Sequence, residues 1–274
     1  MRRIFLAFAV AASAAIPAGA DTRGDVRLLY DALEMSEVIG IMQDEGRDYG
    51  SELRDELFPG RGGPAWTQVV DRLYDAAAMD DLVLAEFERQ MQGVALEPLI
   101  AFFTSQDGER IVRLELEARR AMMDDAIEEA AKDRVKQMRN DDAPRLDLLD
   151  RFIEANELVD SNVVGALNSN YAFYLGLMEG GAFGNDMTEE SILTDVWSQE
   201  ADIRAETIDW VWSYLSLAYQ PLDDAEIEEY TAISASDGGR ALNRAIFGAF
   251  DEMYKTISRG LGQGAAQFIL GEDL

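Results

Sequence analysis

The chain has 274 residues, and its 53 acidic and 24 basic side chains give a formal net charge of −29. This charge argues against nucleic acid as a partner, because such binding depends on neutralising phosphates with lysine and arginine. It also argues against simple adsorption to an anionic lipid surface. Apolar residues make up 48% of the sequence, so the chain can bury a sizeable core and is not predicted to be disordered.

The sequence contains no cysteine and no histidine. Without cysteine there is no disulfide, no thiolate nucleophile and no thiolate metal site. Without histidine the chain lacks the usual general base, the Ser-His and Cys-His nucleophile pairs and the histidine ligands of zinc sites. Few enzyme mechanisms remain, so we predict a non-enzymatic protein that needs no cofactor or metal ion.

The first twenty residues have the pattern of a secretory signal peptide. Arg2 and Arg3 form a short positive region, residues 4–16 are apolar, and residues 18–20 supply a small-x-small cleavage signal that ends at Ala20. The pattern favours the general secretory route over the twin-arginine route. We therefore predict cleavage after Ala20 and a periplasmic location. The longest uncharged run of the mature chain, Ser161 to Met178, carries three asparagines, so no membrane-spanning segment is expected there.

Apolar periodicity predicts helices along the whole mature chain, and no segment has the alternation of a strand. The expected helices of the first half cover residues 25–58, 66–79, 80–92, 96–104 and 105–139, with a proline- and glycine-rich loop at 59–64. The second half is expected to follow the same plan. A helix over residues 145–178 leads to a glycine loop at 180–185, and a last helix ends near Leu270.

One helix–turn–helix pattern occurs twice. Ser105 can cap the helix that follows it, and Gly108 in the first turn lets two helices approach closely at the corner. Ser236 and Gly239 repeat the arrangement. The pattern favours a packing corner; an anion site at the helix N-terminus is the alternative, which the surrounding acidic charge disfavours.

The repeated corner and the shared order of helices and loops predict that the chain arose by duplication. We expect a signal peptide at residues 1–20, an N-terminal helical repeat at 21–142 and a C-terminal repeat at 143–274. Because the break at residues 140–144 is too short for a free linker, the two repeats are predicted to pack as one compact all-α bundle.

The repeated Ser-x-x-Gly corner, with the apolar residues 99–103 before the first copy, resembles the family called domain of unknown function 2059. The second half, from residues 168–173 to 271–274, is similar to the version found in alphaproteobacteria. The family usually has proline where this chain has Gln106 and Asp237. The resemblance implies an exported, all-helical protein of the cell envelope, and it implies no catalytic residues.

Several constellations have both a structural and a functional interpretation. Acidic clusters, such as Asp124-Asp125 with Glu128-Glu129, are typical of solvated helix faces, with weak divalent-cation binding as the alternative. A pair of carboxylates could also hydrolyse a glycan without histidine. The spacing of Gly260 and Gly264 on one helix face favours close helix packing over a phosphate loop, because no strand precedes it.

Aromatic residues crowd the second half of the chain. They are typical of a core; the functional alternative is a partly open groove that binds a peptide or an acyl chain. The candidate contact surface comprises Phe183, Trp197, Trp210 and Tyr230. We predict a periplasmic binding or interaction module whose partner is an envelope protein, a peptide or a lipid. A carboxylate-dependent envelope glycan hydrolase and a periplasmic chaperone are the alternatives.

Overall fold

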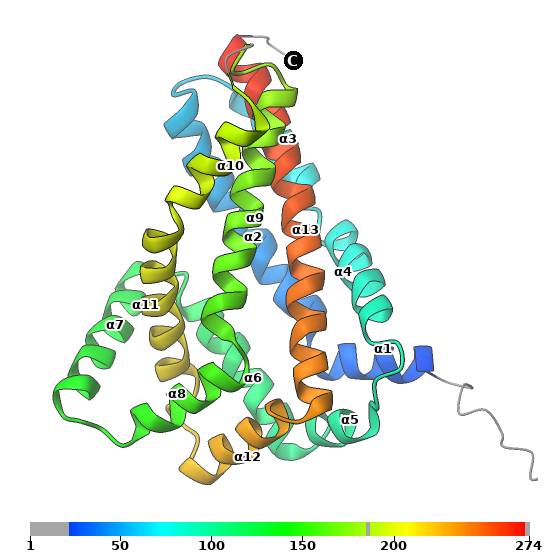
Figure 1. The fold of residues 1–274 in the computed structure, drawn as a ribbon, viewed down its shortest axis with the longest axis vertical. Helices are drawn as coiled ribbons and strands as arrows, with labels where there is room; N and C mark the ends of the chain where they lie inside the picture. Colours follow the sequence, from blue (N-terminus) through cyan, green and yellow to red (C-terminus); the bar gives the residue numbers. More distant parts are fainter. Residues whose placement is uncertain (1–21, 185–186, 272–274) are drawn as a thin grey trace, which may run out of the picture.

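The computed structural model describes residues 22–184 and 187–271. Within these ranges the chain forms thirteen α-helices and no strand, so the prediction of an all-α fold is confirmed. Figure 1 shows two long helices, α9 and α13, running along the middle of the molecule, with short helices gathered at both ends. The signal peptide predicted at residues 1–20 lies outside the described residues. No helix in the described ranges is long and apolar enough to cross a bilayer.

The helices occur in the predicted order, but the boundary predicted between residues 79 and 80 is wrong, because the chain breaks at residues 74–75 instead. Those before residue 143 are α1 (Thr22–Ala32), α2 (Met35–Leu57), α3 (Gly63–Leu73), α4 (Ala76–Gln90), α5 (Glu97–Phe103), α6 (Gln106–Ala121) and α7 (Asp125–Asn140). Those after it are α8 (Arg145–Ala155), α9 (Leu158–Glu179), α10 (Glu189–Ser198), α11 (Glu200–Ala218), α12 (Asp224–Ser234) and α13 (Asp237–Leu270).

Three helices that the sequence predicts as continuous are divided in the structure, so those predictions are wrong in their boundaries. The stretch 25–58 breaks at Glu34 and the stretch 145–178 breaks at Glu157, both in the left-handed backbone region (φ 51° and 50°). The stretch 105–139 breaks before Asp124, whose side chain accepts a hydrogen bond from the Ala126 N–H and caps α7. Left-handed backbone costs a non-glycine residue about 1–2 kcal/mol, so tertiary packing must hold the two glutamates there.

The two serine-capped corners have the same local geometry. The Ser105 hydroxyl accepts a hydrogen bond from the Gly108 N–H (3.1 Å), and the Ser236 hydroxyl accepts one from the Gly239 N–H (3.0 Å). A Cβ atom added to either glycine would lie 2.1 Å from a carbonyl oxygen of the preceding helix. Each corner therefore requires glycine at this position. Whether the halves arose by duplication stays a prediction.

One hydrophobic core extends through both halves, from α1 to α13. Helices of one half pack on helices of the other: α4 lies against α13, and α11 lies against α6 and α7. In Figure 1, α4 and α11 therefore flank the central helices on opposite sides. The predicted boundary at residue 142 falls in the turn between α7 and α8, but the core crosses it, and the halves form one compact unit.

Helices α9 and α13 pack along each other at very short range. A Cβ atom on Gly176 would lie 2.2 Å from the Arg259 carbonyl oxygen, and one on Gly262 would lie 2.1 Å from the Phe173 carbonyl oxygen. The two backbones therefore touch. Gly260 and Gly264 lie on another face of α13, where added Cβ atoms would meet side chains of α3, so the close packing predicted for these glycines is confirmed.

Candidate functional site

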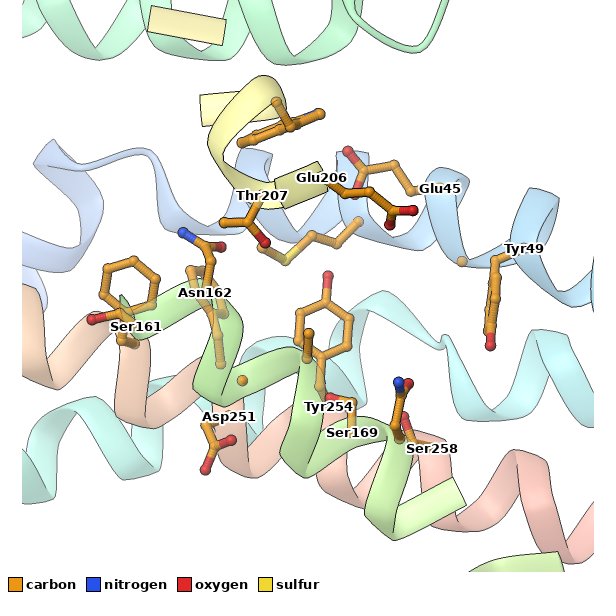
Figure 2. Close-up of a pocket in the computed structure, with 18 of the residues that line it drawn as sticks. Glu45, Tyr49, Ser161, Asn162, Ser169, Glu206, Thr207, Asp251, Tyr254 and Ser258 are labelled. Carbon is orange, nitrogen blue, oxygen red and sulfur yellow. The ribbon is translucent and has the colours of Figure 1, made fainter. Parts of the chain in front are cut away.

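A cleft of about 800 Å³ opens between α2, α9, α11 and α13. Tyr74, at the end of α3, and Arg119, from α6, complete its wall. The volume lies within the usual range for small-molecule sites, roughly 300–1,000 Å³. Figure 2 shows labelled side chains from α2, α9, α11 and α13 around this space.

Aromatic rings form much of the cleft wall. Those that line it are Tyr49, Tyr74, Phe173, Trp210, Tyr214, Phe247, Phe250 and Tyr254. Tyr74 is buried, whereas Tyr49 is 46% exposed, so the rings extend from the core to the surface. Such a lining offers a large apolar contact area to a ligand.

Helical spacing places three of the lining residues on one face of α11. Glu206, Trp210 and Tyr214 follow each other at intervals of four residues, so they lie along one side of the helix. The Trp210 and Tyr214 rings are stacked, with centroids 5.0 Å apart and an interplanar angle of 8°. Trp212 points elsewhere, with the Arg139 guanidinium 5.6 Å from its ring centroid. The sequence therefore presents a carboxylate followed by two aromatic rings to the cleft.

One ion pair forms part of the cleft wall. The Arg119 guanidinium donates two hydrogen bonds to the Glu45 carboxylate, at 2.9 and 2.8 Å. Burial lowers the pKa of Arg119, but the hydrogen bonds and charge of Glu45 outweigh it and hold the pKa above its ordinary value. Arg119 therefore stays charged, and its guanidinium already makes a two-point contact with a carboxylate of the protein.

A second polar cluster lies behind the cleft. The Tyr219 hydroxyl donates to Oε1 of Glu115 (2.6 Å), and the Tyr214 hydroxyl donates to the Glu115 carbonyl oxygen (3.2 Å). Burial raises the pKa of the Glu115 carboxyl to about 7, although hydrogen bonds from Tyr219 and Tyr230 oppose the shift. Tyr214 therefore connects this half-buried acid to the cleft that it lines.

The four residues predicted as a contact surface lie in different places. Trp210 lines the cleft, and the other three are not among its lining residues. Trp197 is 59% exposed on α10. Phe183 is half-buried and stacks on Tyr174, and Tyr230 is half-buried and stacks on Phe102 in α5. The predicted corner residues at positions 105, 108, 236 and 239 serve the fold, as described above.

Carboxylates that lie close together in space could also hold a metal ion. Within residues 22–184 and 187–271, no group of three or more carboxylates is placed to hold a metal ion. Asp80 in α4 accepts hydrogen bonds from Tyr30 in α1 and Ser36 in α2 and thereby joins these helices. This carboxylate has a structural use.

Sequence reasoning missed Glu45, Arg119, Glu206 and Tyr254 as parts of a site. Arg119 and Glu45 are 74 residues apart, and no local pattern marks them as partners. The regular spacing of Glu206 and Trp210 was available in the sequence, but only the fold shows that this face of α11 meets a cleft.

Comparisons with known proteins give no relative from which a function could be taken. No family model matches the chain, and neither the curated proteins nor the solved structures include a match. The resemblance to domain of unknown function 2059 therefore stays a prediction.

Proposed function

We propose that this chain is a non-enzymatic binding protein that holds a small molecule with an apolar body in the cleft between α2, α9, α11 and α13. The observation that carries the proposal is the cleft itself, with a volume of about 800 Å³ and eight aromatic side chains in its wall. A ligand that fills such a cleft removes its own apolar surface and that of the rings from water. This burial stabilises the complex by about 25 cal/mol per Å² of apolar surface.

The arrangement of acids supports binding over glycan hydrolysis. A hydrolase of this kind needs a protonated carboxylic acid with a raised pKa beside the scissile bond. Among the residues that the structure describes, Glu115 is the carboxyl whose pKa is raised, and it does not line the cleft. Glu45, which does line it, is engaged by two hydrogen bonds from Arg119.

A glycine in the cleft wall allows a direct test. A Cβ atom added to Gly165 in α9 would have nothing within 4 Å, so a larger side chain enters the cleft without meeting the backbone. We expect Gly165→Leu to weaken binding of an apolar naphthylamine dye at least about tenfold. Tenfold corresponds to about 1.4 kcal/mol, which is less than the contribution of two buried methylene groups.

Gly40 in α2 supplies the matched control. It is also a helical glycine with open space around an added Cβ atom, and it does not line the cleft. Gly40→Leu is expected to bind the dye as the unmodified chain does, measured by fluorescence titration. Equal weakening in both variants would place the dye elsewhere, and a failure of the unmodified chain to bind any apolar probe saturably would refute the proposed function.

We also propose that the protein acts in the periplasm, where its ligand would be an envelope lipid, peptide or other amphipathic molecule. The support is the pattern of residues 1–20. Intact-mass measurement of the protein recovered from the periplasm of a bacterial host tests this: we expect a mature chain that begins at Asp21. Retention of residues 1–20, or accumulation in the cytoplasm alone, would contradict export.

A further inference from the structure

The charges that line the cleft are mainly negative. Glu45, Glu206 and Asp251 contribute carboxylates, against one cationic side chain, Arg119. Both oxygens of Glu45 accept hydrogen bonds from Arg119, so these two charges compensate each other. The net charge of the cleft lining is therefore negative, and the whole chain also has a negative net charge, −29.

Asp251 is partly neutralised outside the cleft. Its Oδ2 lies 3.2 Å from Nζ of Lys255, and its Oδ1 accepts a hydrogen bond from Asn168 (2.8 Å). Figure 2 shows Asp251 pointing away from the space into which the Tyr254 hydroxyl projects. Asp251 therefore contributes less than Glu206 to the field inside the cleft.

Glu206 is the carboxylate best placed for a ligand. It forms no salt bridge within the part of the chain that the structure describes, and Figure 2 shows it reaching from α11 toward the space above Tyr254. Trp210 follows it by one helical turn on the same face. A carboxylate beside an indole ring is a combination that attracts organic cations, by charge and by the electron-rich ring face.

We propose that the cleft selects an organic cation with an apolar body, such as an alkyl or aryl amine. The ammonium group lies between the Glu206 carboxylate and the Trp210 ring, and the apolar body lies among the rings farther along the cleft. This inference rests on the proposed function and adds the charge of the ligand to it. An anionic ligand is disfavoured, because it must compete with Glu45 for Arg119 and approach a strongly acidic protein.

Three probes of one shape separate the contributions of charge and of apolar contact. They are phenyltrimethylammonium, its neutral isostere tert-butylbenzene, and benzenesulfonate, each used below its solubility limit. By calorimetry at low ionic strength, we expect the cation to bind the unmodified chain at least about threefold more tightly than the neutral probe, as expected for a partly exposed charge contact with a ring. The sulfonate is expected to bind at least about tenfold more weakly than the cation.

The outcomes distinguish the two proposals. If all three probes bind with equal affinity, the inference is overturned and the proposed function stands. If none of the three probes binds, both are overturned. Tighter binding of the sulfonate would overturn the inference and point to Arg119 as the anchor.

Variants locate the cation. Glu206→Gln is expected to weaken binding of the cation about threefold and to leave the neutral probe unchanged, because only the charge is removed. Asp195→Asn, an equal charge change at an exposed position of α10 that does not line the cleft, is expected to leave both affinities unchanged. If Glu206→Gln binds the cation as the unmodified chain does, or if Asp195→Asn weakens it equally, the placement of the ammonium group at Glu206 is wrong.

Discussion

Replacing Gly262 with alanine is expected to lower the free energy of unfolding by about 3 kcal/mol, near the upper end of the usual cost of overpacking. The added Cβ atom would lie 2.1 Å from the Phe173 carbonyl oxygen and 2.8 Å from the Leu177 nitrogen. Both are backbone atoms of α9, so no side chain can rotate away. The helices must separate, and this cost exceeds the gain of about 1 kcal/mol that alanine normally brings to a helix interior.

Urea unfolding of the variant measures the loss, and Gly40→Ala is the control. An added Cβ atom at Gly40 would have nothing within 4 Å, so this variant is expected to be as stable as the unmodified chain or up to about 1 kcal/mol more stable. If Gly262→Ala unfolds at the same urea concentration as the unmodified chain, the backbones of α9 and α13 are farther apart than the structure places them.

The same contact matters for the cleft. Ser169 and Phe173 line the cleft from α9, and Tyr254 and Ser258 line it from α13. Because Gly176 and Gly262 bring the two backbones together beside these residues, they help to set the width of the cleft. A packing defect at Gly262 is therefore expected to reduce ligand affinity as well as stability.

Much of the fold follows from local patterns in the sequence. Apolar positions at helical spacing specify the helices, and Ser105 and Ser236 each begin a helix with a hydrogen bond inside the same turn. The breaks at Glu34 and Glu157 could not be predicted in this way. Neither stretch has a glycine or proline at the break, and a glutamate takes left-handed backbone only because packing of distant helices requires it.

The candidate site was predictable only in part. The crowding of aromatic residues in the second half indicated a binding surface near Trp210, because large rings are enriched at such places. The partners of that surface come from α2 and α6, far away in the sequence, and the Arg119–Glu45 pair forms only when these two helices of the first half pack against each other. Burial of a carboxyl such as Glu115 is likewise a property of the assembled core.

Glu115 is expected to make the stability of the protein depend on pH near neutrality. Its carboxyl is surrounded by tyrosines, and burial raises its pKa from the ordinary 4.5 to about 7. A group whose pKa is raised by folding favours the folded state in its protonated form. Its contribution is therefore fully present below about pH 4.5 and is lost as the pH rises through about 7.

Glu115→Gln removes this titration and keeps an oxygen that can accept the hydrogen bond from the Tyr219 hydroxyl. The free energy of unfolding of the variant, minus that of the unmodified chain, is expected to rise by about 3 kcal/mol between pH 4.5 and pH 8, since each unit of pKa shift corresponds to about 1.4 kcal/mol. Urea unfolding at several pH values measures this difference, in which the titrations of the other acids cancel. Glu117→Gln, which removes a carboxylate at an exposed position of the same helix, is the matched control. A constant difference for Glu115→Gln would show that the carboxyl is solvated, and that the tyrosines around it do not form a dry pocket.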